Sequence, residues 1–228
     1  MDGRPLPFPL PPGLRAAWLG CLALGVGASM AFALEPDPSR AVHPTSPCGE
    51  DVRKLTVSDL EGRSRSPLDL GAEDFGVFVF LSNDCPVANR YAPEIRRIAG
   101  KFEGKRVRFW MVHPLESETL ESIRAHAKEY ELPGTVVHDP GGTLARCLGI
   151  TVTPEVAVVD RQTTILYRGR IDDRYPALGQ QRRRPTRRDL VEALSAVLAG
   201  EPVDAPRTKA VGCSLPVNPP AAAAEARP

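Results

Sequence analysis

A strand-to-helix junction with a cysteine between the two elements is the feature that most constrains the fold of this chain. Residues Val77–Leu81 form a continuous apolar run of strand length, which predicts a buried central strand. A helical pattern follows from Pro86, and proline is tolerated in the first turn because the N–H groups there have no helical partner. Cys85 lies at the junction, near unpaired backbone N–H groups and the positive end of the helix dipole. This position favours the thiolate and predicts redox or nucleophilic chemistry.

The second cysteine of a Cys-x-x-Cys pair is missing, because position 88 is Ala. A local dithiol–disulfide cycle is therefore excluded. If Cys85 cycles between oxidation states, its partner comes from a distant part of the chain or from another molecule.

Apolar periodicity along the chain predicts alternating strands and helices. Such an alternation, closed by a hairpin and a helix, implies an α/β fold with a central mixed β-sheet that carries helices on both faces. The predicted strands are 54–58, 77–81, 107–112, 134–138, 155–160 and 164–170. The first predicted helix begins at residue 86, and the others cover 117–130, 142–148 and 187–199. A loop is predicted at 149–153, and Thr186 is predicted to cap the last helix.

The N-terminus is typical of a secretory signal peptide. Arg15 precedes an apolar, Gly- and Ala-rich run without charge, and Ala31-Phe32-Ala33 is a small-x-small cleavage pattern. An uncleaved anchor is the alternative, since the run is just long enough to span a bilayer. The pattern assigns residues 1–34 to the signal peptide or anchor, 35–51 to a linker, 52–200 to one globular domain, and 201–228 to a cysteine-containing, Pro- and Ala-rich tail.

Two motifs in residues 52–200 resemble the thioredoxin fold, specifically its redoxin branch of AhpC/TSA peroxiredoxin-like and TlpA/ResA-like proteins. The first is Cys85-Pro86, which follows a strand and opens a helix that Pro93 is expected to kink. The second is Thr153-Pro154 directly before a strand, and a closing hairpin and helix complete the match. The resemblance implies that the peptide bond before Pro154 is cis and that this proline packs beside the reactive sulfur.

A proline beside Cys85 also has a physical rationale of its own. Proline has no N–H, so Pro154 neither hydrogen-bonds a facing thiolate nor hinders a substrate backbone, and a cis bond fixes a tight bend. Thr153 then offers its backbone groups to an extended partner. Taken alone, Pro154 fits a proline that merely starts a strand; together with Cys85 it favours a redox site.

The chain departs from the peroxiredoxin pattern near the cysteine. Ser82 provides the hydroxyl three residues before Cys85, but Phe78 stands where the proline of that pattern is expected. Peroxide chemistry also needs an arginine to stabilise the thiolate and the leaving oxygen. Arg168 and Arg170 are the candidates, although exposed arginines are the more common outcome at such positions.

The remaining cysteines leave alternatives open. Cys213 follows the last predicted helix in a segment without a strong fold signal, so packing does not explain its presence. Its functional interpretations are a mobile resolving thiol for Cys85 or a metal ligand. The structural alternatives are an incidental tail cysteine or a cysteine bridged to Cys48. Cys147 has helical spacing with two leucines and is expected to be a small core residue rather than a resolving thiol. The residues His113, His126 and His138 are expected to be solvated.

The sequence thus predicts an extracytoplasmic thiol–disulfide or thiol–peroxide oxidoreductase. Its predicted site is Cys85, Thr153 and Pro154, with Cys213 or an external thiol resolving the intermediate. The expected partners are thiols, disulfides or peroxide, and no cofactor or bound metal is expected. The formal net charge of +1 gives no argument for nucleic-acid binding. Membrane contact is expected only through an uncleaved N-terminal segment. Two alternatives are a copper-binding module resembling the Sco group, with Cys85, Cys213 and a histidine holding Cu(I), and a non-catalytic redoxin scaffold.

Overall fold

The computed structural model of this protein describes residues 52–216. The predicted signal segment and linker, with Cys21 and Cys48, lie outside the described residues, as does the tail from residue 217.

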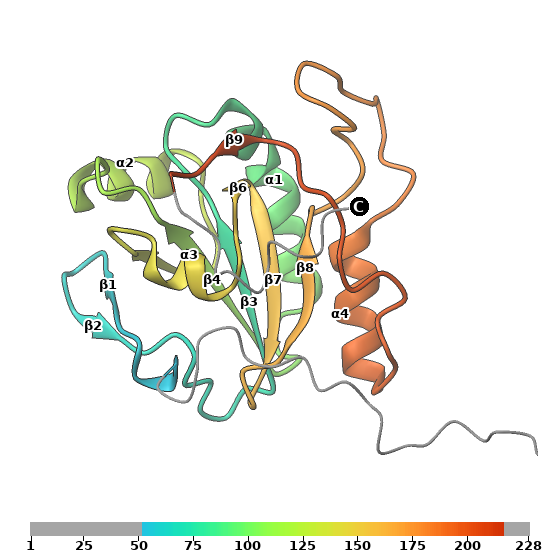
Figure 1. Cartoon of the computed structure of the whole chain (residues 1–228), viewed down its shortest axis with the longest axis horizontal. Coiled ribbons are helices and arrows are strands. Elements are labelled where there is room, and N and C mark those ends of the chain that lie inside the picture. Colours follow the sequence, from blue (N-terminus) through green and yellow to red (C-terminus); the bar gives the residue numbers. More distant parts are fainter. Residues whose placement is uncertain (1–51, 217–228) are drawn as a thin grey trace, which may run out of the picture. The chain divides into compact units, whose positions relative to one another are not determined.

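A seven-stranded mixed sheet forms the centre of the fold, with strand order β2-β1-β5-β4-β3-β7-β8 (Figure 1). The inner pairs β3–β4 and β4–β5 are parallel, and the remaining pairs are antiparallel. The strands of this sheet are β1 (Val57–Asp59), β2 (Ser64–Arg65), β3 (Phe75–Phe80), β4 (Val107–His113), β5 (Thr135–His138), β7 (Glu155–Asp160) and β8 (Ile165–Gly169).

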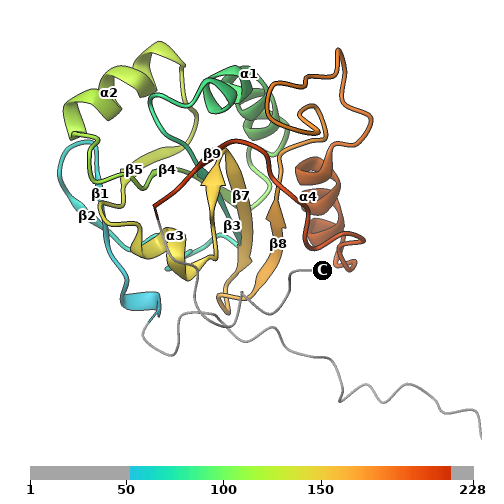
Figure 2. The same cartoon turned by 45° about the horizontal axis from the view of Figure 1, so that its top comes forward.

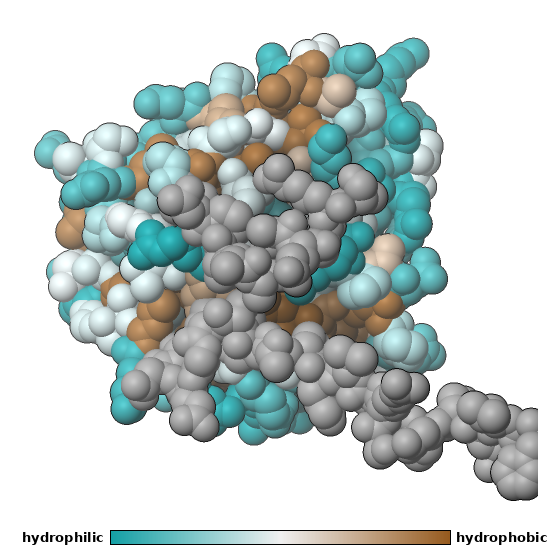
Figure 3. All heavy atoms as spheres, in the orientation of Figure 1, coloured by the Kyte–Doolittle hydropathy of each residue, from teal (hydrophilic) through white to brown (hydrophobic). Residues whose placement is uncertain are grey.

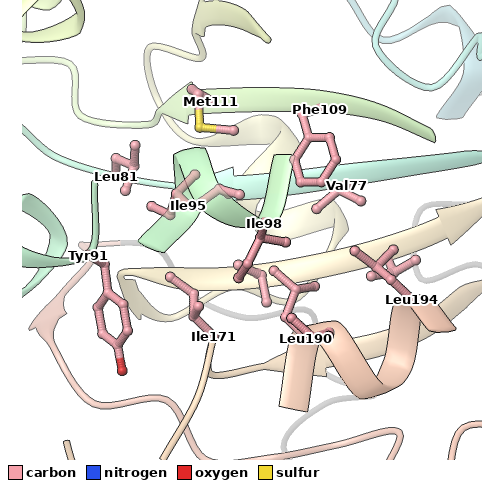
Figure 4. Close-up of a cluster of buried hydrophobic side chains, with 14 of the residues drawn as sticks. Val77, Leu81, Tyr91, Ile95, Ile98, Phe109, Met111, Ile171, Leu190 and Leu194 are labelled. Carbon is pink, nitrogen blue, oxygen red and sulfur yellow. The ribbon is translucent and has the colours of Figure 1, made fainter. Parts of the chain in front are cut away.

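Helices cover both faces of the sheet, as Figures 1 and 2 show for α1 and α3. The alternation of side chains along β3 explains this layering. Val77 and Val79 face the cluster built with α1 and α4, part of which Figure 4 shows, whereas Phe78 and Phe80 face the cluster that contains α3. The helices are α1 (Pro86–Lys101), α2 (Leu120–Glu129), α3 (Thr143–Cys147) and α4 (Asp189–Ala199), and a short 3-10 turn covers Val52–Lys54.

The predicted fold class is confirmed, with local differences, among them the short strand β2, which was not predicted. The loop predicted at 149–153 contains a two-residue strand, β6 (Val152–Thr153), and the supposed tail contributes its partner, β9 (Cys213–Ser214). Thr186 does not cap the last helix: α4 begins at Asp189, and the backbone N–H of Thr186 donates instead to the carboxylate of Asp173 at 2.7 Å. The charged segment at 181–188 is largely exposed.

Candidate active site

Cys85 occupies the N-cap position of α1, directly after the loop that ends β3. Its backbone is extended (φ −85°, ψ 107°), so its sulfur turns back over the first turn and accepts the N–H of Ala88 at 3.5 Å. The side chain is 0% exposed. The helix-start position expected from the sequence is therefore present, but the sulfur is covered.

The Thr153–Pro154 loop covers one side of the sulfur. The peptide bond between these two residues is cis. As a thiol, Cys85 donates its S–H to the carbonyl oxygen of Thr153 at 3.0 Å. The antiparallel pairing of β3 with β7, in which Phe80 lies opposite Glu155, brings the end of β3 beside the start of β7 and so places this loop against Cys85.

Cys213 lies next to Cys85 through the small β6–β9 sheet. In this antiparallel pair Thr153 lies opposite Cys213, and Val152 lies opposite Ser214. This pairing brings the thiol and the N–H of Cys213 close enough to the Cys85 sulfur to shift its pKa. Both cysteines are free, so the alternative of a bridge from Cys213 to Cys48 is wrong.

The two thiols titrate in opposite directions. Burial raises the pKa of Cys85, but the hydrogen bonds that it accepts from the Cys213 thiol and from the N–H of Ala88 outweigh this cost. With two weaker bonds, from the Cys213 N–H and the Thr153 hydroxyl, the net effect is a lowered pKa of Cys85. The hydrogen bond to Cys85, burial and the nearby thiolate raise the pKa of Cys213 to about 11. The pair therefore favours a thiolate on Cys85 and a thiol on Cys213.

Cys147 is disulfide-bonded, although its side chain is buried as expected. Because Cys85 and Cys213 are free, the partner of Cys147 lies outside the described residues. The expectation of a simple core cysteine is therefore corrected to a structural cysteine. A disulfide-bonded residue is not available as the resolving thiol in this state.

Glu155 is a site residue that the sequence analysis missed. It is buried directly after Pro154, and its carboxylate accepts the N–H of Thr151 at 2.9 Å and the N–H of Val152 at 3.4 Å. Burial raises its pKa despite these hydrogen bonds. The carboxylate thus fixes the loop that carries Thr153. An acidic residue at the head of an otherwise apolar strand was the available signal.

A buried polar cluster supports the loop before Cys85 from the other side. Glu118 accepts the N–H of Asn83 at 2.6 Å and lies 3.1 Å from Nδ1 of His113. His126 hydrogen-bonds to the side chain of Asn89 at 2.8 Å, and Asn89 in turn donates to the carbonyl oxygen of Asn83 at 2.9 Å.

The expectation of solvated histidines is wrong. His113, His126 and His138 are all buried, because distant segments supply partners that the sequence does not reveal. For His138 that partner is the carbonyl oxygen of Leu115, at 3.1 Å.

Both arginines considered for peroxide chemistry lie beside carboxylates. Arg170 forms an ion pair with Asp189 at 2.8 Å, and Arg168 lies 3.9 Å from Glu155. The Ser82 hydroxyl lies 3.1 Å from the hydroxyl of Thr153, so Ser82 contacts the Thr153–Pro154 loop. Within residues 52–216, no group of three or more His, Cys, Asp or Glu side chains is arranged to hold a metal ion.

The mixed sheet, the helix-capping cysteine and the proline loop beside it are the features of a thioredoxin fold. The model of the AhpC/TSA family matches residues 48–168, which is more than half of the chain, and the chain belongs to this family. The redoxin resemblance seen in the sequence is thereby confirmed. No protein with a curated description matches the chain.

Two of the solved structures that match this chain, with TM-scores of 0.63, show the same fold. An uncharacterized conserved protein from Geobacillus kaustophilus is 24% identical, with a TM-score of 0.63 over 72% of this chain and 89% of that one. A hypothetical protein from Sinorhizobium meliloti 1021 is also 24% identical, with a TM-score of 0.63 over 72% of this chain and 91% of that one. A secreted disulfide oxidoreductase from Mycobacterium tuberculosis matches with a TM-score of 0.46 and 17% identity, over 66% of this chain and 98% of that one.

Proposed function

We propose that this protein is an extracytoplasmic thiol–disulfide oxidoreductase in which Cys85 is the nucleophile and Cys213 the resolving thiol. The observation that carries the proposal is the pairing of β6 with β9, which brings the free Cys213 beside the Thr153–Pro154 loop that covers Cys85. Neither cysteine has a second cysteine at Cys-x-x-Cys spacing. In this proposal the C-terminal segment supplies the distant thiol that the sequence requires.

The proposed cycle follows ordinary thiol–disulfide exchange. The Cys85 thiolate attacks one sulfur of a substrate disulfide, forms a mixed disulfide and releases the other substrate sulfur as a thiolate, which takes up a proton. Cys213 then loses its proton and attacks the Cys85 sulfur, and the second substrate sulfur leaves. The substrate gains two electrons and the protein keeps a Cys85–Cys213 disulfide. An external dithiol reductant restores both thiols.

Disulfides are favoured over peroxides as the oxidising substrate. Peroxide reduction needs a cation at the departing oxygen, and neither of the two arginines considered is unpaired. Phe78 also faces the α3 cluster, at the position where the peroxiredoxin pattern has proline. Both observations support exchange with sulfur rather than oxygen.

The proposed location outside the cytoplasm rests on two supports. The N-terminal pattern is typical of a secretory signal, and Cys147 is disulfide-bonded, which fits an oxidising compartment. In the part of the chain that the structure describes, no helix has the length and apolarity needed to cross a bilayer.

Turnover of glutathione disulfide with dithiothreitol as reductant tests the proposal. The wild type is expected to turn over, Cys85→Ser to be inactive, and Cys213→Ser to be slower and dependent on dithiothreitol concentration. Ser214→Ala serves as the matched control, because Ser214 is an exposed neighbour in the same strand. Equal turnover by Cys213→Ser and wild type would remove Cys213 from the mechanism. Tight Cu(I) binding through Cys85 without any disulfide exchange would favour the copper module instead.

A further inference from the structure

The C-terminal segment 209–216 crosses the candidate active site as a strap, shown in red across β6 in Figures 1 and 2. It is anchored immediately before its start. The N–H of Arg168 donates to the carbonyl oxygen of Pro206 at 2.9 Å, and the N–H of Thr208 donates to the carbonyl oxygen of Arg168 at 3.0 Å. The Thr208 hydroxyl also lies 2.7 Å from the Tyr167 hydroxyl. The strap therefore continues from a fixed point on β8.

The strap covers the backbone edge of the Thr153 loop. Cys213 pairs with Thr153, and the N–H of Leu215 donates to the carbonyl oxygen of Thr151 at 2.9 Å. Gly212 lies so close that a Cβ on it would overlap the carbonyl oxygen of Thr153. Thr153 and Cys85 are both 0% exposed beneath it. A disulfide substrate consequently reaches the Cys85 sulfur only after the strap has moved.

The β6–β9 pair is small enough to exchange partners. Each strand has two residues, and the pair forms a sheet separate from the central one. A strand edge with free N–H and C=O groups binds any extended polypeptide by strand addition, with side-chain pockets providing specificity. Apolar side chains also gather at the surface at the top of Figure 3.

We propose that the strap occupies a docking groove for an extended, cysteine-containing polypeptide, and that its residues show which segment the groove accepts. Gly212 marks a position that requires a small residue, and Cys213 marks the sulfur that meets Cys85. Ser214 is exposed and sets no requirement, while Leu215 is 8% exposed and fills an apolar site. The preferred substrate is thus a disulfide within a segment of the pattern small–Cys–any–apolar. This proposal rests on the proposed function.

The strap and the substrate would occupy the same edge of β6, so resolution of the mixed disulfide by Cys213 is coupled to release of the substrate. While substrate occupies the edge, Cys213 is displaced and the mixed disulfide at Cys85 is not attacked from within. When the strap returns to β6, the Cys213 sulfur bonds to the Cys85 sulfur and the substrate sulfur leaves with the electron pair of the broken bond. The same movement removes the substrate backbone from Thr153.

The test uses a synthetic peptide with the sequence of residues 209–216, its cysteine joined to glutathione as a mixed disulfide. Single-turnover reaction with Cys85 is measured in the full chain carrying Cys213→Ser, with and without Gly212→Ala. The added methyl group should dislodge the strap and accelerate reaction by about tenfold or more. Gly100→Ala is the matched control, because a Cβ on Gly100 meets nothing within 4 Å. Leu215→Asp provides a second way to release the strap, and thermal unfolding verifies that each variant is folded.

Peptide selectivity tests the groove itself. With the strap released, a peptide with valine in place of its glycine, or aspartate in place of its leucine, should react about tenfold or more slowly than the parent peptide. Equal rates for the three peptides, or no acceleration by either strap variant, would overturn the docking proposal. If Cys85 reacts with no disulfide in any variant, glutathione disulfide included, the proposed function itself fails.

Discussion

The thiols of Cys85 and Cys213 do not titrate independently, because each shifts the pKa of the other. At the scale of single residues, the lowered pKa of Cys85 and the raised pKa of Cys213, about 11, describe one proton held between two sites. Cys85 is the better nucleophile because it carries the thiolate. Cys213 becomes the attacking group once Cys85 is in a mixed disulfide and no longer carries that charge.

Replacing Cys213 with alanine should raise the pKa of Cys85. The substitution removes the thiol hydrogen bond that opposes the cost of burial, although the backbone N–H at position 213 remains. Ultraviolet thiolate absorbance followed against pH measures the shift, with Ser214→Ala as control. An unchanged or lowered midpoint for Cys85 in the Cys213→Ala variant would contradict the assigned contact.

His126 should make the fold sensitive to mild acid. Burial, and then the proximity of His113, lower the pKa of His126 from 6.5 to about 4. As the pH falls from about 6.5 to about 4, the unfolded chain binds a proton that folded His126 does not, so the free energy of unfolding decreases. The expected loss is roughly 1–3 kcal/mol. Urea unfolding at several pH values measures it.

The variant His126→Gln separates this contribution from other acidic effects. Its amide N–H replaces the hydrogen bond that the imidazole makes to Asn89, but it does not titrate. The variant should lose less stability between neutral pH and the acidic end than the wild type does. Equal losses in the two proteins would show that His126 does not account for the acid sensitivity.

At the scale of elements, long periodic segments were predictable and short paired ones were not. The sequence alone reveals β3 by its apolar run and α1 by its helical spacing of apolar residues. In each element the side chains that the fold buries recur in a pattern that is visible in the sequence. The two-residue strands β6 and β9 have no period to detect. Their pairing depends on where Thr153 and Cys213 meet in space, so the sequence left the role of Cys213 open.

The start of α4 illustrates how a distant residue overrides a local signal. Thr186 is a favourable N-cap type, yet Asp173 binds the N–H groups of both Thr186 and Arg187, at 2.7 and 3.0 Å. The helix consequently begins later, at Asp189. The carboxylate joins the exposed 181–188 loop to the segment that follows β8.

Removing this carboxylate should loosen that connection. Asp173→Ala leaves two N–H groups without their acceptor and should lower the free energy of unfolding by roughly 1–3 kcal/mol. Asp173→Asn retains a carbonyl acceptor for the two N–H groups and loses only the second oxygen, which accepts from Arg182 and from the Thr186 hydroxyl, so a smaller loss is expected. Urea unfolding compares the two variants, and an equal loss in both would assign the stabilisation to the contacts of that second oxygen.

At the scale of the whole molecule, the Cys85–Cys213 pair connects the centre of the chain to its C-terminal segment. Oxidation of the pair would close a long loop and restrict the unfolded chain. The oxidised protein should therefore be more stable than the reduced one, by up to about 4 kcal/mol. Thermal unfolding of both forms, with Cys147 kept disulfide-bonded in each, measures the difference. A Cys213→Ser variant that shows the same oxidant-dependent shift would rule out this cross-link as its source.

Disulfide mapping after reaction with one equivalent of glutathione disulfide tests the central claim most directly. In the wild type, mass spectrometry should find a Cys85–Cys213 bond and no retained glutathione, whereas Cys213→Ser should retain one glutathione on Cys85. Glutathione that persists on Cys85 in the wild type, or modification of Cys213 while Cys85 remains a free thiol, would contradict the account.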